Sequence, residues 1–363
     1  MKTVLGNVLL TVSQWYAFFL LSQLSLFLYP PQYGVLVFAL GFVGRILGSV
    51  LFGYIGDKVD RKLSLTLTTV VLALSSVMVI LYYTYPTTLA FRLLQGLSLG
   101  GEWGGASTVV IEAYSESRLR GFFASLVQLA VPISVILSSF SLFLLSFYSL
   151  SDWRFCLVFP VVLSIFSTLF IKDVKSVKGG TGIPIINAIR DDWKDIVKAI
   201  GIKVSESANF YIFTSFVFSE PVGTNEVSTL VAIAVAIQLL LLPLFGYLSD
   251  VLGRKSVVFL GAALMALGSF LFSSNLTLGE VVLSISDASL YAPQSSIFTE
   301  LFNREYRFTA SNFSYQVASL LGGTLAPVVL RLSGYGVLQV SLPYVVVTVV
   351  SLTLIKETKG KRI

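Results

Sequence analysis

The chain has 363 residues, of which 55% are hydrophobic and only 12% are charged, and its net charge is +6. Soluble domains carry about 25% charged residues, so this composition excludes an ordinary soluble globular protein. The chain has no histidine and a single cysteine, Cys156, which excludes histidine-based catalysis, ordinary zinc sites, disulfides and CxxC redox pairs. We therefore expect no cofactor, no metal and no nucleic-acid partner.

Apolar stretches follow one another along the chain, and each has about the 20 residues that a helix needs to cross a bilayer. They fall at 5–29, 33–56, 64–84, 88–112, 121–149 and 154–171, and then at 201–220, 226–249, 256–274, 277–299, 309–331 and 336–355. The sequence therefore predicts an all-α membrane protein with twelve transmembrane helices.

One long polar interval separates the sixth stretch from the seventh. Its apolar residues recur at helical spacing between positions 185 and 197, which is typical of an amphipathic helix on a membrane surface. We expect an N-terminal six-helix bundle at 1–171, a linker with this helix at 172–200, and a C-terminal six-helix bundle at 201–363.

The basic residues predict the orientation of the chain in the membrane. With twelve spans, both termini and the linker share one face, and 21 of the 25 lysines and arginines fall on it. Loops rich in lysine and arginine stay in the cytoplasm. We therefore expect a multi-pass protein of the cell membrane with both termini cytoplasmic.

Two loops 193 residues apart in the chain share a pattern. The second span ends in GYIGDKVDRK from Gly53, and the eighth ends in GYLSDVLGRK from Gly246. A weaker echo joins the segment Glu112 to Arg120 with the segment Glu300 to Arg307. Parallel six-helix repeats around a central cavity are typical of secondary transporters.

The repeated loops predict a cytoplasmic gate. Glycines permit close helix contact, and each aspartate can cap a helix N-terminus or pair with an arginine. The gating residues are Gly53, Asp57, Arg61, Gly246, Asp250 and Arg254. Asp60 stands where the second copy has Gly253, so we expect the first gate to be looser, because a Cβ disfavours a left-handed turn.

These loops resemble the cytoplasmic signature of the major facilitator superfamily, and the resemblance covers the whole chain. The run RLLQGLSLG at 92–100 resembles a second signature of that superfamily. GGEWGGA at 100–106, YAPQ at 291–294 and YQ at 315–316 look like its metabolite:proton symporter family. The resemblance implies two pseudo-symmetric six-helix bundles and transport by alternating access.

Charged residues inside the spans are candidates for function, because a charge in a bilayer is costly unless it is paired or hydrated. Arg45 and Arg92 lie in spans two and four, and a guanidinium grips a carboxylate with a planar fork. Each arginine also has a structural interpretation, as an ion pair or by reaching toward the interface. The resemblance places both in the transport pathway. Glu206 lies near Lys203, so we expect an interfacial ion pair there.

Polar and aromatic residues on the odd-numbered spans are expected to line the cavity of the resembled fold. They are Gln14, Trp15, Tyr16, Gln128, Asn209, Tyr211, Tyr315 and Gln316. Packing or anchoring at the membrane interface is the alternative for each.

Proton coupling is where the chain departs from the family it resembles. That family carries a Glu-Trp-aromatic-Asp segment on span one, whereas this chain has Gln14-Trp15-Tyr16-Ala17. Neither replacement titrates, so a proton must travel on another buried carboxylate. We expect Glu102 to be the carrier, with Asp287 as the second candidate; loss of coupling is the rival interpretation.

The leading function is therefore a monomeric secondary transporter that moves a small organic solute, a carboxylate in our expectation, together with protons across the lipid bilayer. An uncoupled uniporter or exchanger of a sugar or zwitterion, and a transporter-like ligand sensor, stay open. An enzyme or an ATP-driven pump is disfavoured, since the sequence has no nucleophile–base pair and no Walker motif.

Overall fold

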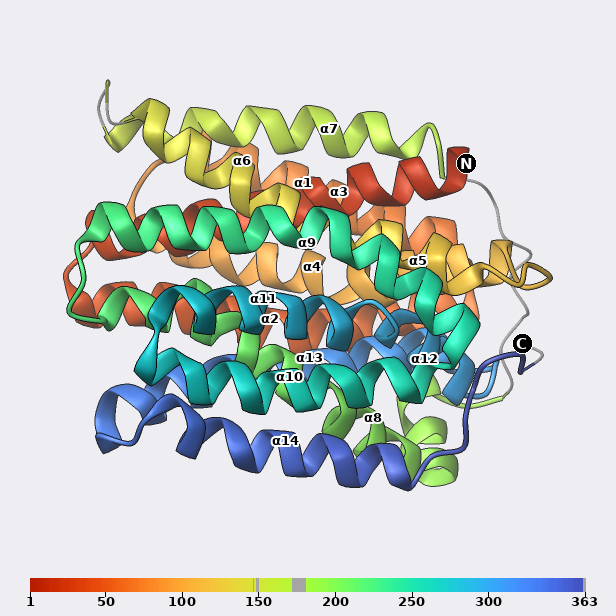
Figure 1. Cartoon of the computed structure of the whole chain (residues 1–363). Coiled ribbons are helices and arrows are strands. Elements are labelled where there is room, and N and C mark those ends of the chain that lie inside the picture. Colours follow the sequence, from red (N-terminus) through yellow and green to blue (C-terminus); the bar gives the residue numbers. More distant parts are fainter. Residues whose placement is uncertain (146, 148–149, 172–180, 362–363) are drawn as a thin grey trace. The chain divides into compact units, whose positions relative to one another are not determined.

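The structure, a computed structural model, describes residues 1–145, 147, 150–171 and 181–361 (Figure 1). Within these ranges all regular secondary structure is helical. The first half contains α1 (Lys2–Leu28), α2 (Pro31–Lys58), α3 (Arg61–Leu81), α4 (Tyr85–Ala113), α5 (Arg120–Gln128), α6 (Ala130–Leu145), the 3-10 helix η1 (Leu150–Leu157) and α7 (Val158–Thr168). The second half contains α8 (Pro184–Thr214), η2 (Phe216–Ser219), α9 (Thr224–Leu252), α10 (Arg254–Ser274), α11 (Leu276–Tyr291), α12 (Gln294–Leu301), α13 (Arg307–Ser333) and α14 (Val337–Thr353).

Each of the predicted spans corresponds to one helix or to two consecutive helices. Span five is interrupted at Leu129, and span ten is interrupted at Ala292 and Pro293, where proline cannot continue the hydrogen-bond ladder. Among the described residues, seven helices are long and apolar enough to cross a membrane on their own. The other spans are divided, shorter or more polar, as in α4, which holds both Arg92 and Glu102.

The predicted amphipathic segment forms the first part of α8. Residues 184–214 run continuously as α8, but two helical segments meet at a kink at Asp192, where φ −127° and ψ 26° depart from helical geometry. Exposed Ile189 and Trp193 give this part of α8 the apolar side that the sequence predicts. The preceding linker residues 172–180 lie outside the described residues, and the division of the chain at 172–200 stays a prediction.

The chain forms two compact units that exchange short segments. Unit 1 contains residues 1–113, 130–188 and 303–316; unit 2 contains 114–129, 189–302 and 317–363. Unit 1 therefore includes the first turns of α13, and unit 2 includes α5. Within unit 1, α2 packs along α4, and α1 contacts α6 and α7; within unit 2, α10 packs against α11 and α14 (Figure 1).

Close packing of α2 on α4 depends on glycine. A Cβ at Gly48 would lie 1.8 Å from the carbonyl oxygen of Leu97, and a Cβ at Gly100 would lie 2.0 Å from that of Arg45. Backbone atoms cannot move aside as a flexible side chain can, so these glycines let the two helix backbones touch. This contact fixes Arg45 on α2 against the buried face of α4.

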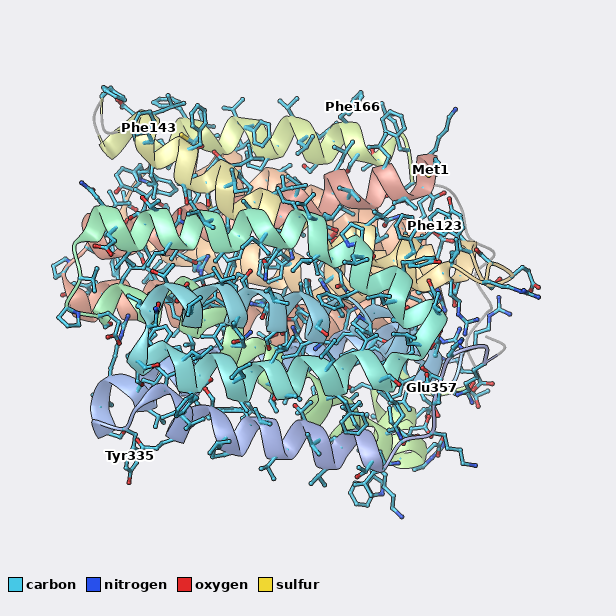
Figure 2. The ribbon with its side chains drawn as sticks, viewed as in Figure 1. Met1, Phe123, Phe143, Phe166, Tyr335 and Glu357 are labelled. Atoms are coloured by element: carbon cyan, nitrogen blue, oxygen red, sulfur yellow. The ribbon has the colours of Figure 1, made fainter. Side chains whose placement is uncertain are left out.

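Large apolar side chains point outward from the helices, as a lipid solvent requires. Figure 2 shows Phe143 on α6 and Phe166 on α7, which are 58% and 49% exposed. A soluble protein would cover such a surface. The polar side chains are instead buried: Arg45, Arg92, Glu102 and Asp287 are each at most 1% exposed.

Candidate functional site

A charged cluster at the end of α2 holds the first turn of α13 in unit 1. The Asp57 carboxylate accepts hydrogen bonds from the backbone N–H groups of Phe308 (3.1 Å) and Thr309 (2.8 Å) and from the Thr309 hydroxyl (2.7 Å). A carboxylate at this position satisfies unpaired N–H groups and complements the helix dipole. Gly53 allows the approach, because a Cβ there would lie 2.8 Å from the Thr309 Cα.

Glu112 completes this cluster by binding two arginines. Arg61 pairs with Glu112 and lies 4.0 Å from Asp57, and Arg307 donates to Glu112 at 3.2 Å. We call Asp57, Arg61, Glu112 and Arg307 the unit 1 latch.

Unit 2 repeats the same arrangement with the first turn of α5. Asp250 accepts hydrogen bonds from the N–H groups of Gly121 (3.0 Å) and Phe122 (2.8 Å). Arg254 donates to Asp250 at 2.5 Å. A Cβ at Gly246 would lie 2.1 Å from the Ser125 Oγ, so glycine again permits the contact.

Glu300 takes the place of Glu112 in unit 2. Its Oε1 accepts from Arg120 at 2.7 Å and from Arg254 at 3.3 Å. Asp250, Arg254, Glu300 and Arg120 form the unit 2 latch. The structure thus joins each predicted aspartate–arginine pair to a glutamate and an arginine taken from the weaker sequence echo.

The expected looseness of the first loop is wrong, because Asp60 has no left-handed backbone. Its φ is −165°, and its carboxylate caps α3 by accepting from the Leu63 N–H at 2.7 Å. Gly253 does adopt a left-handed φ, +104°. The two loops therefore begin the next helix differently: a side-chain cap from Asp60 begins α3, and a left-handed glycine, Gly253, precedes α10.

The C-terminal segment binds the unit 2 latch. Lys361 accepts from Arg120 through its carbonyl oxygen (2.8 Å) and donates its ammonium group to the Glu300 carbonyl oxygen (2.6 Å). Glu357 accepts from the N–H groups of Arg254 (2.9 Å) and Lys255 (3.0 Å). Burial raises the pKa of Glu357, but hydrogen bonds from backbone N–H groups outweigh it and hold the pKa below 4.5.

Arg45 is a buried cation without a full set of partners. Its Nε donates to the Gln316 Oε1 at 2.7 Å, whereas Nη1 and Nη2 have no hydrogen-bond partner among the described residues. The residue is 1% exposed. A buried guanidinium with two free amino groups is electrostatically unsatisfied and attracts an anion.

Aromatic rings surround the Arg45 guanidinium. Its central carbon lies 5.0 Å from the Trp15 ring, 5.3 Å from Phe18, 5.1 Å from Phe42 and 5.9 Å from Tyr315. Such cation–π contacts favour the charge but offer no acceptor for the amino groups. We call these four rings the aromatic ring set.

Tyr315 and Gln316 are held in unit 1 by contacts with α4. Tyr315 stacks on Trp103, with ring centroids 3.7 Å apart, and the Gln316 Nε2 donates to the Gly100 carbonyl oxygen at 3.4 Å. The structure therefore brings Arg45, Trp15, Tyr315 and Gln316 together, as candidate members of one site.

Arg92 differs from Arg45 in being well supplied with acceptors. It donates to the carbonyl oxygens of Val37 (3.1 Å) and Phe18 (3.0 Å) and to Gln95 (2.7 Å) and Ser22 (2.7 Å). These bonds connect α1, α2 and α4. The guanidinium of Arg92 thus has a structural role, and the protein itself supplies its acceptors without a substrate anion.

The other predicted residues of α1 point in different directions. Gln14 accepts from Ser98 on α4 at 2.7 Å, and its Nε2 has no partner among the described residues. Tyr16 faces α6 instead, where its hydroxyl lies 2.7 Å from the Ser141 Oγ. Tyr16 is therefore placed apart from the Arg45 site.

Glu102 lies on α4 and faces α1. Its Oε1 contacts the Thr11 hydroxyl, and its Oε2 has no hydrogen-bond partner among the described residues. The Thr11 hydroxyl also lies 2.8 Å from the Asn7 carbonyl oxygen. Glu102 is fully buried, so bulk solvent does not reach its carboxyl group.

Asp287 lies in unit 2 among amides. It accepts from the Asn209 Nδ2 at 3.3 Å and from the Gln238 Nε2 at 2.7 Å. Lys203 interacts with it electrostatically and forms an ion pair with Glu206. The predicted ion pair is present and is buried within the protein, since Lys203 is 1% and Glu206 4% exposed; its position at the membrane interface stays a prediction.

Two further cavity candidates also fall in unit 2. Gln128 is fully buried, and neither end of its amide is bonded within the described ranges. Tyr211 packs against α13, where a Cβ at Gly323 would lie 2.6 Å from its ring. Gln128 is thus buried and Tyr211 partly buried within unit 2.

Several polar residues of these sites were missed by sequence reasoning. Glu112, Glu300 and Arg307 stand in the weaker echo between the halves, which indicated a second repeated position but no role and no partner. Thr11 gave no signal, because hydroxyl side chains are common in spans.

Comparisons with known proteins agree with this architecture. The family model described as "Sugar (and other) transporter" matches residues 3–173, and that described as "Major Facilitator Superfamily" matches residues 199–361. The chain is 29% identical over 417 aligned positions to the inner membrane metabolite transport protein YhjE of Escherichia coli, covering 99% of this chain and 94% of that protein.

A second relative and a solved structure extend these matches. The shikimate transporter of Escherichia coli is 25% identical, over 90% of this chain and 86% of its own. The crystal structure of the human organic anion transporter MFSD10 superposes with a TM-score of 0.78 at 15% identity, over 98% of this chain and 99% of that one. The latter similarity concerns the fold.

Proposed function

We propose that this chain, which belongs to the major facilitator superfamily, moves a small organic carboxylate across the membrane together with a proton. Membership makes it a multi-pass membrane transporter of metabolites and not an enzyme. The substrate class, the proton and the roles of individual residues are the proposal.

The observation that carries the carboxylate assignment is the state of Arg45. Its Nη1 and Nη2 form the two-pronged end that binds both oxygens of a carboxylate, and neither has a partner among the described residues. The side chain is fixed from behind by Gln316, at 2.7 Å from its Nε. A substrate carboxylate would supply the two missing hydrogen bonds and the missing negative charge.

The aromatic ring set supports a substrate that is apolar or cyclic beyond its carboxylate. Trp15 and Tyr315 offer flat faces beside the guanidinium. Flat apolar faces pack well against a carbon ring and gain little from a highly charged chain. Shikimate, the compound for which one relative is named, is a cyclic carboxylate.

The proton assignment rests on the single hydrogen of the Thr11 hydroxyl. That hydroxyl lies within hydrogen-bonding distance of two acceptors, the Asn7 carbonyl oxygen and the Glu102 carboxyl group. If it donates to Asn7, its contact with Glu102 is a hydrogen bond only when Glu102 donates. A protonated Glu102 satisfies both contacts, and an ionised one satisfies only one.

The two assignments are linked through α1. Thr11 contacts Glu102, and Trp15, one turn further along, contacts Arg45. One helical turn spans about 6 Å, so a shift of α1 that follows proton loss reaches the anion site. This proximity is how we expect proton release and carboxylate release to be coupled.

The two latches are proposed to act as the cytoplasmic gate. Each ties an aspartate at the end of one helix to the N-terminus of another, through contacts that form or break as a set. Elements with two discrete arrangements are suited to alternating access. We expect the latch side to face the cytoplasm, as the distribution of lysine and arginine predicts.

Transport in proteoliposomes tests the proposal. Counterflow with a panel of carboxylates, betaines, amino acids and sugars identifies the substrate, and accumulation is then measured with and without an inward proton gradient. We expect a carboxylate to be accumulated by the wild type and only exchanged by Glu102→Gln. A neutral or cationic substrate contradicts the Arg45 assignment, and equal accumulation by Glu102→Gln moves the proton to Asp287.

A further inference from the structure

One face of α11 in unit 2 carries four polar side chains in a row. Glu280, Ser284, Asp287 and Tyr291 are spaced by four, three and four residues, which places them on one side of a helix over about 16 Å. Each is at most 3% exposed. We call these residues the polar file.

Glu280 is the most unusual member of the polar file. It is fully buried, and neither carboxyl oxygen has a hydrogen-bond partner among the described residues. An ionised carboxylate in such a position costs several kcal/mol, because it loses water and gains no donor. Glu280 is therefore expected to be neutral and to carry a proton.

Asp287, two turns further along the same face, lies where a charge can be accepted and released. Gln238 on α9 donates to it at 2.7 Å, and Lys203 on α8 interacts with it electrostatically. An amide suits both forms of an acid, since it donates to a carboxylate and, turned over, accepts from a carboxyl O–H. Asn209 is fully buried beside it, and its Oδ1 has no partner within the described residues.

The charges of this interior do not balance unless acids are protonated. Outside the unit 2 latch, Lys203 is the one buried cation among the described residues of unit 2, and it is paired with Glu206. The other charged residues on α9, on α10 and on residues 317–333 of α13 stand within three residues of a helix end: Glu226, Asp250, Arg254, Lys255 and Arg331. One buried ammonium group thus faces three buried acids, and neutrality requires two protons.

We propose that unit 2 contains its own proton-binding site, in which Glu280 and Asp287 each hold an exchangeable proton and Lys203 is the shared counter-charge. When Asp287 releases its proton to water, the ammonium group of Lys203 stands between two carboxylates, Asp287 and Glu206. Glu280 is the reservoir at the other end of the polar file, and it reloads Asp287 through Ser284 and water. This site is distinct from Glu102, and only its use in transport rests on the proposed function.

Infrared spectroscopy of the purified chain in lipid nanodiscs tests the site without a substrate. At pH 7 we expect the absorption of protonated carboxyl groups to lose one group in Glu280→Gln and one in Asp287→Asn. The amide has the shape of the neutral acid, so both variants should fold. Glu226→Gln, at an exposed position of α9, is the control and should lose none. An unchanged band in Glu280→Gln overturns the proposal.

Two further variants sharpen the test. Glu280→Asp should restore a shifted band, which separates loss of the acid from misfolding. Lys203→Met should gain one protonated carboxyl group, because Glu206 loses its counter-charge. No gain there contradicts the charge balance.

Transfer of the nanodiscs into heavy water tests exchange along the polar file. We expect the Asp287 carboxyl band to exchange more slowly in Glu280→Gln than in the wild type, and an equal rate contradicts the reservoir role of Glu280. These spectra do not depend on substrate uptake. They therefore test the proton-binding site of unit 2 even if the chain transports no carboxylate, or if Glu102→Gln does not behave as the proposed function predicts.

Discussion

Replacing Arg45 with lysine separates charge from geometry at the proposed anion site. The substitution keeps the positive charge but loses the fork formed by Nη1 and Nη2, and it also loses the 2.7 Å bond from Nε to Gln316. An ammonium group binds a carboxylate as a point charge, so one of two charge-assisted hydrogen bonds to the substrate is lost. The variant should therefore bind the carboxylate more weakly without losing it entirely.

The size of the loss follows from the hydrogen bonds involved. A hydrogen bond to a charged group contributes about 1.5–3 kcal/mol, so Kd should rise about 10- to 150-fold. Two tryptophans report on binding directly, since Trp15 lies 5.0 Å from the guanidinium and Trp103 stacks on Tyr315 at 3.7 Å. We would titrate the purified protein with the carboxylate that gives the strongest counterflow and follow their fluorescence.

Arg92→Lys is the matched control. Arg92 is equally buried, but its four acceptors come from the protein itself. Its replacement should lower Tm while leaving Kd nearly unchanged in the folded fraction. The reasoning is refuted if Arg45→Lys binds as tightly as the wild type, or if Arg92→Lys raises Kd more than Arg45→Lys does.

Three further predictions concern the latches and the helix contacts. Asp57→Asn should weaken the unit 1 latch by about 1–2 kcal/mol, because the cap of α13 loses its charge. We expect slower transport with an unchanged Kd for the substrate. A raised Kd at a normal transport rate would contradict a role of this latch as a gate. Gly100→Ala should lower Tm, because its Cβ would lie 2.0 Å from the Arg45 carbonyl oxygen. Gly223→Ala is the control and should not lower Tm, because its Cβ would have no atom within 4 Å. Equal Tm values of the two variants would contradict the dependence of the α2–α4 contact on glycine. The pKa of Glu357 is lowered, so its hydrogen bonds to the α10 N-terminus are present above pH 4.5 and are lost as pH falls through the folded value. The protection factor for amide exchange at the α10 N-terminus, which corrects for the intrinsic pH dependence of exchange, should therefore fall there in the wild type and stay constant in Glu357→Gln. Identical protection profiles of the two proteins would contradict this role of Glu357.

The sequence predicted the spans and the repeat because both depend on local composition. Hydropathy located most helices to within a few residues, but α8 begins at Pro184 rather than near 201. It also did not show the interruptions at Leu129 and Ala292, which depend on packing and on one proline. The repeat gave Asp57 and Asp250 because the same loop recurs. Their partners on α13 and α5 could not be read from the pattern, since contacts between distant helices leave no local periodicity.

The burial of the charged residues inside the spans was also predictable, but the direction of each side chain was not. Arg45 and Arg92 look equivalent as buried arginines. Arg92 has four acceptors, whereas Nη1 and Nη2 of Arg45 have none among the described residues. Trp15 and Tyr16 are neighbours, and consecutive residues of a helix point about 100° apart, so only Trp15 reaches Arg45. Helices that are apolar on all sides give no moment from which such directions could be derived.

The absence of acids from the Gln14–Ala17 segment of α1 is the reason why we propose a proton site on α4 in unit 1. Gln14 retains a hydrogen bond to Ser98, so α1 keeps its polar contact with α4 while losing the ability to titrate. One turn further along α4, Glu102 contacts Thr11 on α1, a residue that can accept as well as donate. In the proposed mechanism, a carboxyl group on α4 therefore takes the place of the acids that the resembled family carries on span one. We expect a proton on Glu102 to act on α1 through Thr11, one turn from Trp15, which lies 5.0 Å from the Arg45 guanidinium.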